Sequence, residues 1–120
     1  FAVGDLLRVR PERQAYDLVL LVYLHVNPED RWMIMRSAAE YVAPNGLLVV
    51  VGHHRDNLES GVGGPQDPAL LYTEADLTED LEGTGLVVER AERLLRDVGD
   101  ESSRGTAIDV VLVARRPAAD

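Results

Sequence analysis

The sequence predicts a layered α/β domain with a strand–helix–strand unit, a long loop, a short helix and a terminal antiparallel hairpin. Two wholly uncharged apolar runs, at 18–24 and 47–52, flank a segment with helical periodicity. Two further strand-like runs, at 86–95 and 106–116, follow near the end. The link between these two is too short for a helix, so they are expected to pair antiparallel. The length of 120 residues fits one domain.

The first strand is predicted at 16–23, "YDLVLLVY". Its apolar character is continuous and does not alternate with polar residues. Such a run is typical of strands in parallel sheets, which helices cover on both faces. We therefore expect this strand to be buried on both sides.

A helix is predicted directly after it. Asn27 is a candidate N-cap, Pro28 suits the first helical position, and Glu29 and Asp30 suit the positive end of the helix dipole. The apolar residues that fall on one stripe at helical spacing are Ile34, Met35, Ala38, Ala39 and Val42. "APNG" at 43–46 predicts the end of the helix. The second apolar strand, "LLVVVG", should then lie parallel to the first, with a right-handed crossover.

Residues 53–72 predict a long loop, rich in glycine and proline. Loops of this length in compact domains are usually functional or disordered. Thr73 is expected to cap a short helix, with Asp76 completing part of a capping box. The link at 96–105, "RDVGDESSRG", is predicted as the hairpin loop.

Composition excludes several classes of function. A net charge of -9 argues against binding to nucleic acid, which needs a positive face. The absence of cysteine and lysine excludes disulfides, thiolate nucleophiles and Schiff-base or phosphate-binding lysines. No run is long enough to predict a membrane span or a signal peptide, which makes a cytoplasmic protein the default. The start at Phe1, without methionine, suggests a fragment.

Four stretches carry a resemblance to a known family: "YDLVLLVYLHV", "AEYVAPNGLLVVVG", "VGDLL" and "GHHRDNLESGVGGPQDPALLYTEADL". The first is similar to the fourth strand of class I S-adenosylmethionine-dependent methyltransferases, the second to their helix, Pro-Gly turn and fifth strand, and the third to the acidic turn after their third strand. The fourth stretch resembles a small-molecule branch of the bacterial methyltransferases. The resemblance implies the C-terminal half of a Rossmann-like doubly wound sheet. Residues 1–120 would form a partial domain, because the Gly-rich loop that holds the cofactor in the family has no counterpart here.

The resemblance also implies a cofactor, S-adenosylmethionine, and residues that would bind it. Asp5, after a partial strand at 1–3, would accept a hydrogen bond from the adenine amino group, and the Leu6 backbone N–H would meet a ring nitrogen. A turn aspartate that satisfies its own backbone is an equal alternative for Asp5. Val22 and Tyr23, at the end of the first strand, would face the methionine part of the cofactor.

Two histidines at strand ends are candidate catalytic residues. His25 could act as a general base on the methyl acceptor, because the pKa of imidazole lies near neutrality. A structural role in the turn that enters the helix is the favoured alternative. His53 could line the acceptor pocket; a metal site formed with His54 and Asp56 is disfavoured, because adjacent strand residues point to opposite faces.

The leading hypothesis is methyl transfer to a small-molecule acceptor, as part of a longer chain. The alternative of another class is a non-catalytic remnant of the fold that serves as a dimerisation or interaction module. A flavodoxin-like binding domain is disfavoured by the terminal hairpin. We also expect the edge of the first strand to be exposed, so that the isolated chain forms a homodimer or aggregates.

Overall fold

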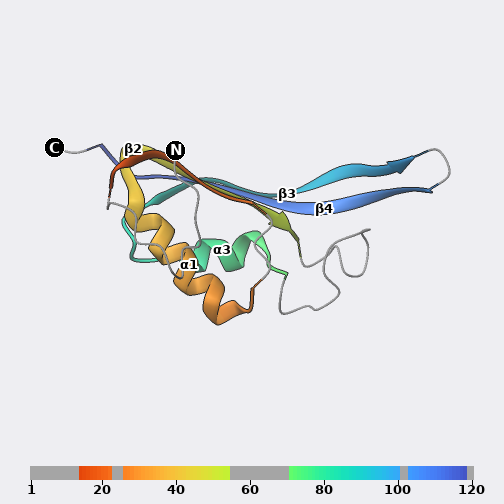
Figure 1. Cartoon of the computed structure of the whole chain (residues 1–120), viewed down its shortest axis with the longest axis horizontal. Coiled ribbons are helices and arrows are strands. Elements are labelled where there is room, and N and C mark those ends of the chain that lie inside the picture. Colours follow the sequence, from red (N-terminus) through yellow and green to blue (C-terminus); the bar gives the residue numbers. More distant parts are fainter. Residues whose placement is uncertain (1–13, 23–25, 55–70, 101–102, 119–120) are drawn as a thin grey trace.

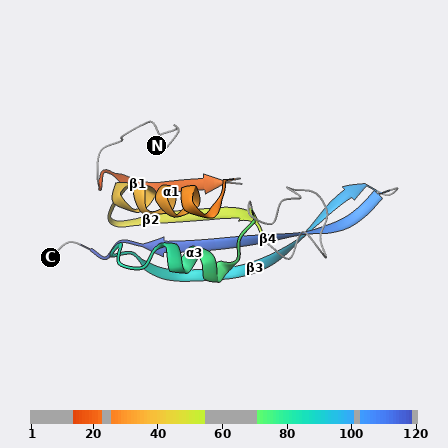
Figure 2. The same cartoon turned by 90° about the horizontal axis from the view of Figure 1, so that it is seen from below.

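The computed structural model describes residues 14–22, 26–54, 71–100 and 103–118. Along the chain, its elements are β1 (Tyr16–Val22), α1 (Pro28–Tyr41), β2 (Val42–His53), α3 (Glu74–Asp80), β3 (Val87–Asp100) and β4 (Ser103–Arg115). The strands form one four-stranded sheet in the order β1-β2-β4-β3, which Figure 2 shows side by side. The predicted α/β fold class, with a strand–helix–strand unit and a terminal hairpin, is confirmed.

β1 and β2 run parallel, with Leu18 opposite Leu47 and Val22 opposite Val51. β4 then pairs antiparallel with β2 on one side and with β3 on the other. The parallel pair was the central expectation from the sequence. Because a parallel pair requires a crossover connection, α1 must cross from the end of β1 back to the start of β2.

The helix signals in the sequence are also confirmed. The Asn27 side chain accepts a hydrogen bond from the Asp30 backbone N–H at 2.8 Å, and Pro28 occupies the first turn. Thr73 caps α3 in a complete capping box, in which the Asp76 side chain accepts a bond from the Thr73 N–H at 2.9 Å. Each cap satisfies backbone donors that have no partner inside their helix.

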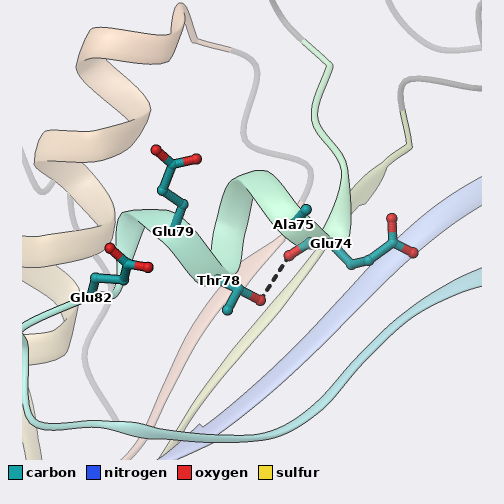
Figure 3. A pocket seen from close by; sticks show the side chains of 5 residues that line it. All are labelled: Glu74, Ala75, Thr78, Glu79 and Glu82. Carbon is teal, nitrogen blue, oxygen red and sulfur yellow. Dashed lines mark hydrogen bonds between the residues drawn. The ribbon is translucent and has the colours of Figure 1, made fainter.

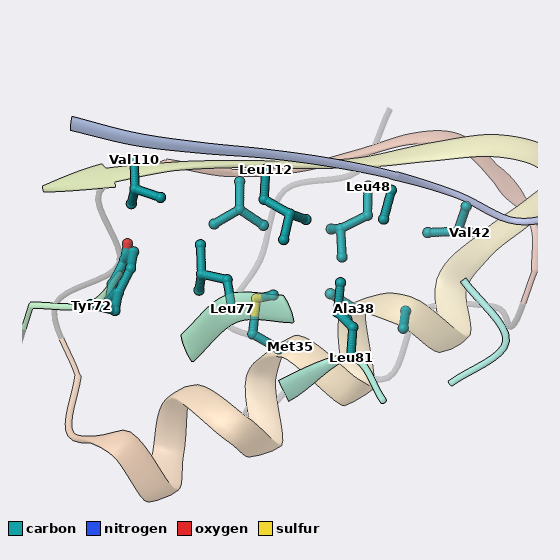
Figure 4. Close-up of a cluster of buried hydrophobic side chains, with 12 residues drawn as sticks. Met35, Ala38, Val42, Leu48, Tyr72, Leu77, Leu81, Val110 and Leu112 are labelled. Carbon is teal, nitrogen blue, oxygen red and sulfur yellow. The ribbon is translucent and has the colours of Figure 1, made fainter. Parts of the chain in front are cut away.

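The hydrophobic core lies between the sheet and the helices (Figure 4). The stripe predicted for α1 is buried, and so are α3's Leu77 and, from the sheet, Leu48, Val50, Val110 and Leu112. In Figure 1, α1 and α3 lie on the same side of the sheet. Since side chains alternate between the two faces of a strand, every second residue of β2 and β4 points into this core.

The expectation that β1 is buried on both faces is wrong for the described part of the chain. Leu18, Leu20 and Val22 are 46%, 47% and 51% exposed, while Val19 and Leu21 pack against the core. The cause is the placement of α1 and α3 on one face only, with β1 at the edge of the sheet. The apolar run is therefore suited to burial on both faces. In the described structure only one of these faces is covered.

The hairpin loop predicted at 96–105 is largely wrong as well. The β3–β4 ladder continues from Arg96 opposite Ala107 to Asp100 opposite Ser103. The two strands extend well beyond β2, whose pairing with β4 ends at His53 and Asp109. Figure 1 shows this ribbon projecting from the rest of the molecule. With the ribbon included, the chain measures 54 × 26 × 25 Å. Once two strands have paired, backbone bonds can continue the ladder through residues whose polar composition suggests a loop.

Gly52 allows the closest approach between β2 and the segment before α3. A Cβ placed on Gly52 would lie 2.6 Å from Cζ of Tyr72 and still closer to its hydroxyl oxygen. Tyr72 is 1% exposed, so its ring has little room to move away. The position therefore requires a residue without a side chain, for steric reasons alone.

We expect Gly52→Ala to lower the free energy of unfolding by about 1–3 kcal/mol, the usual cost of overpacking a core. Denaturant unfolding followed by circular dichroism measures this change. The matched control is the same substitution in a Tyr72→Ala background. There the added methyl group has space, and the additional cost should nearly vanish. An equal cost in both backgrounds would contradict the steric account.

Candidate functional site

The carboxyl ends of β1 and β2 meet at one edge of the sheet. Parallel strands place these ends side by side, and ligands of open α/β sheets bind there. Val22 ends β1, and His53 ends β2. Val22 lies opposite Val51 in the register and is 51% exposed. We call the region around Val22, His53 and Asp109 the strand-end site.

His53 lies opposite Asp109 of β4, on the face of the sheet that points away from α1 and α3. Its Nδ1 is 3.6 Å from the Asp109 Oδ1, with side chains 12% and 7% exposed. This separation permits an electrostatic interaction and is longer than a good hydrogen bond. Asp109 was missed in the sequence, although a single acid within the apolar run of β4 is a detectable signal.

His54 points to the opposite face, as expected for adjacent strand residues. Its Nε2 donates a hydrogen bond to Oε1 of Glu74 at 2.9 Å, and its ring is 4% exposed. The carboxylate can only accept, which fixes Nε2 as the protonated nitrogen of this pair. The same bond lowers the pKa of Glu74 below its usual value of 4.5. The two histidines therefore serve different faces of the sheet.

A buried ion pair connects α1 with α3 beneath the sheet. Nε of Arg31 lies 2.7 Å from Oδ2 of Asp80, and the two side chains are 9% and 6% exposed. The Arg31 guanidinium also lies 5.8 Å from the centre of the Tyr72 ring. Arg36 adds a bond to the Glu82 carbonyl at 2.7 Å. These contacts fix the position of α3, and with it Glu74 and the backbone that precedes it.

The exposed side of α3 carries a shallow depression of about 360 Å³, lined by Glu74, Ala75, Thr78, Glu79 and Glu82 (Figure 3). Figure 3 shows Glu74 and Glu79 on the helix and Glu82 in the turn that follows it. The Thr78 hydroxyl donates to the Glu74 carbonyl at 2.8 Å, which is a bond within the helix. The depression is acidic and open, and we read it as a solvated helix surface.

The structure places only some of the residues predicted from the sequence. Val22 and His53 lie at adjacent strand ends, as expected from the parallel pairing. Asp5, Leu6, Tyr23 and His25 lie outside the described residues, so their predicted roles stay predictions. Among the residues described, no group of three or more His, Asp or Glu side chains is arranged to hold a metal ion. None of the described helices has the length and apolar character needed to cross a membrane.

Removal of Arg31 should destabilise the protein strongly, because it leaves the Asp80 carboxylate buried without its guanidinium. We expect Arg31→Met to lower the free energy of unfolding by about 3–5 kcal/mol. The double variant Arg31→Met/Asp80→Leu should recover most of this loss, since no buried charge is left. Chemical denaturation of the single and double variants checks both values. A double variant as unstable as the single one would show that Arg31 acts through packing.

The His54–Glu74 bond predicts a pH dependence of stability. The pKa of Glu74 is lowered in the folded state, so its contribution is complete above pH 4.5 and is lost as pH falls through the folded value. Glu74→Gln should remove this component of the acid sensitivity. The difference in unfolding free energy between the parent and Glu74→Gln should shrink as pH falls below 4.5. Glu79→Gln, an exposed position on the same helix, is the control and should show a smaller change.

Comparisons with known proteins identify the fold. No model of a protein family matches the sequence. No curated protein sequence matches it either. Solved structures do match. A SAM-dependent methyltransferase from Methanosarcina mazei superposes with a TM-score of 0.67 and 13% identity, over 99% of this chain and 68% of its own. The N-methyltransferase NodS from Bradyrhizobium japonicum superposes with a TM-score of 0.61 and 16% identity, over 97% of this chain and 58% of its own.

The [4+2]-cyclase SpnF also matches, with a TM-score of 0.64 and 14% identity, over 99% of this chain and 56% of its own. This chain therefore spans between 56% and 68% of the length of these three structures. At such low identity the likeness establishes the fold. The chain has the Rossmann-like fold of part of a SAM-dependent methyltransferase.

Proposed function

We propose that this chain takes part in S-adenosylmethionine-dependent methyl transfer to a small-molecule acceptor, as part of a larger methyltransferase unit. The observation that supports the proposal is the strand arrangement. A parallel β1–β2 pair continued by an antiparallel β4–β3 hairpin superposes on a SAM-dependent methyltransferase over 99% of this chain. The strand-end site lies where ligands of such sheets bind.

The described residues of the strand-end site fit the methionine part of this cofactor. Val22 offers a half-exposed apolar side chain next to Val51. Asp109 adds a carboxylate near the same edge, and the whole chain carries a net charge of -9. Both suit a ligand with a positive sulfonium. When bound, S-adenosylmethionine supplies a methyl group that the sulfonium has already activated. Asp5, Leu6 and Tyr23 remain predicted contributors to its binding.

In this proposal the protein chiefly orients the acceptor and excludes water. Methyl transfer requires the acceptor atom, the methyl carbon and the sulfur in line, so positioning supplies much of the rate enhancement. His53 would take the proton of an acceptor hydroxyl or amine at Nε2, because its Nδ1 faces Asp109 at 3.6 Å. The Asp109 carboxylate would stabilise the imidazolium that results. His25 remains a second candidate for this base.

The acidic character of the chain favours a small molecule over a nucleic acid as acceptor. A polyanionic acceptor would meet a net charge of -9, whereas binding to nucleic acid relies on a positive face that displaces counterions. The charge does not select among small acceptors. The match to a [4+2]-cyclase shows that the same fold carries other chemistry, so the reaction needs a direct test.

A non-catalytic interaction module is the second candidate, and one observation favours it. The face of β1 that carries Leu18, Leu20 and Val22 is about half exposed over three consecutive outward positions. Contiguous exposed apolar surfaces can mark protein interfaces. The two candidates differ in what they predict for cofactor binding.

We expect S-adenosylhomocysteine to bind a longer polypeptide, in which a Gly-rich cofactor-binding segment is joined before position 1, and to bind the present 120 residues at least about tenfold more weakly. The reason is that the Gly-rich loop of the family has no counterpart in this sequence. Isothermal titration calorimetry of both polypeptides measures the two affinities. Asp109→Asn in the longer polypeptide should lower turnover at neutral pH more than it lowers this affinity. Failure of both polypeptides to bind would favour the interaction module.

A further inference from the structure

Two large apolar side chains lie exposed on the solvent side of α1. Trp32 and Met33 are 49% and 47% exposed, although Arg31 and Ile34 on either side of them are buried. The layers of an α/β domain explain why one side of a helix is apolar, because that side packs on the sheet. They give no reason for tryptophan and methionine on the opposite side. Trp32 is also the only tryptophan of the chain.

The Trp32 ring is held in place by Arg36, one helical turn further on. The Arg36 guanidinium lies 5.0 Å from the centre of the Trp32 ring, within the range of a cation–π interaction. Its Nη1 also donates to the backbone carbonyl oxygens of Glu82 at 2.7 Å and of Asp80 at 3.4 Å. Arg36 thus connects Trp32 with the end of α3. A side chain that is already ordered loses less conformational entropy on binding, which favours a partner.

Exposed carboxylates border these apolar side chains. Glu29 lies one turn before Trp32 and Met33, and Glu40 lies one turn beyond Arg36 on the same helix. Glu82 lies next to Arg36, because its carbonyl oxygen accepts the bond from that side chain. All three glutamates are exposed. We call this set of residues the outer patch, which consists of Trp32, Met33, Arg36, Glu29, Glu40 and Glu82.

From this composition we infer that the outer patch binds a basic segment of another protein that carries at least one large apolar side chain. An apolar centre with a charged border is the usual composition of a protein interface, and tryptophan, methionine and arginine are enriched there. The apolar side chain of the partner would pack on Trp32 and Met33, while its lysine or arginine side chains would approach the glutamates. The inference concerns association alone and does not require methyl transfer.

A second copy of this chain is a poorer partner. Two copies related by a two-fold axis would place outer patch against outer patch, so that the glutamates of both would face each other. Each copy also carries a net charge of -9, and the repulsion between them opposes association. A basic segment carries the opposite charge and is attracted by the same field. Charge complementarity therefore selects a basic partner over a homodimer.

The test uses the full 120-residue chain and a defined probe. The probe is a synthetic helical peptide of about 20 residues, in which leucine and lysine repeat at helical spacing and tryptophan is absent. Because Trp32 is the only tryptophan, its fluorescence reports on the outer patch alone. The peptide should shift the emission to shorter wavelength as the indole loses contact with water, and calorimetry should show a one-to-one complex. A matched peptide with glutamate in place of lysine should not bind.

Two substitutions test the apolar centre and the charged border separately. Met33→Asp should weaken the complex at least about tenfold, because it places a carboxylate in the apolar centre. Glu82→Lys should weaken it about threefold or more, because it replaces an attractive charge with a repulsive one. Glu92→Lys is the matched control, since it changes the net charge equally. Glu92 lies opposite Val111, on the face of the sheet that points away from α1, and its side chain is 40% exposed. Screening by salt should leave the affinity of this control within about twofold of the parent.

Trp32→Ala, measured by calorimetry, replaces Met33→Asp should the latter fail to fold, as judged by circular dichroism. It should weaken the complex about tenfold as well. Four results would overturn the inference. They are no binding of the lysine peptide, binding that leaves the Trp32 emission unchanged, equal losses for Glu82→Lys and Glu92→Lys, and a homodimer of the chain alone in which the Trp32 emission is already shifted. The third result would indicate general charge attraction, and the fourth would make a second copy the occupant.

Discussion

The parallel pairing of β1 with β2 is the constraint on which the rest of the structure depends. A parallel pair needs a long crossover, and α1 supplies it because Asn27 and Pro28 start a helix soon after β1 ends. The buried stripe of α1 then fixes which face of the sheet becomes the core. The same pairing brings the carboxyl ends of both strands to one edge. The position of the strand-end site is thus a consequence of backbone topology, before any side chain is considered.

The pleat of β2 divides the chemistry of the molecule between the two faces. The His54 side chain points toward the helices and forms a hydrogen bond with Glu74 of α3. Together with the Arg31–Asp80 ion pair, this bond holds α3 in place. His53, one residue earlier, faces the other way, toward Asp109. Adjacent residues in a strand cannot serve one site. This division places the His54–Glu74 bond on the helical face and the His53–Asp109 contact on the other face.

The sequence was most informative where local signals and packing agree. The caps at Asn27 and Thr73, the stripe of α1 and the parallel pairing of β1 with β2 follow from local patterns, and all were predicted correctly. The extended ribbon was not, because the ladder that carries it depends on pairing between segments distant from one another. Val22 and His53 were predicted at strand ends, whereas the Asp109 partner of His53 depends on the antiparallel register, which the sequence did not specify. The side-chain contacts between paired strands therefore could not be predicted from the sequence, because they depend on the register.

The exposure of β1 bears directly on the candidate site. Val22 is the last residue of β1, belongs to the strand-end site and is 51% exposed. A segment that pairs with β1 would run alongside Val22 and close one side of that site. Burial of the site would then strengthen the interaction between His53 and Asp109, because charges interact more strongly in a lower dielectric. An interaction surface and a catalytic site need not be competing interpretations of this fold: the first can be the means by which the second is completed.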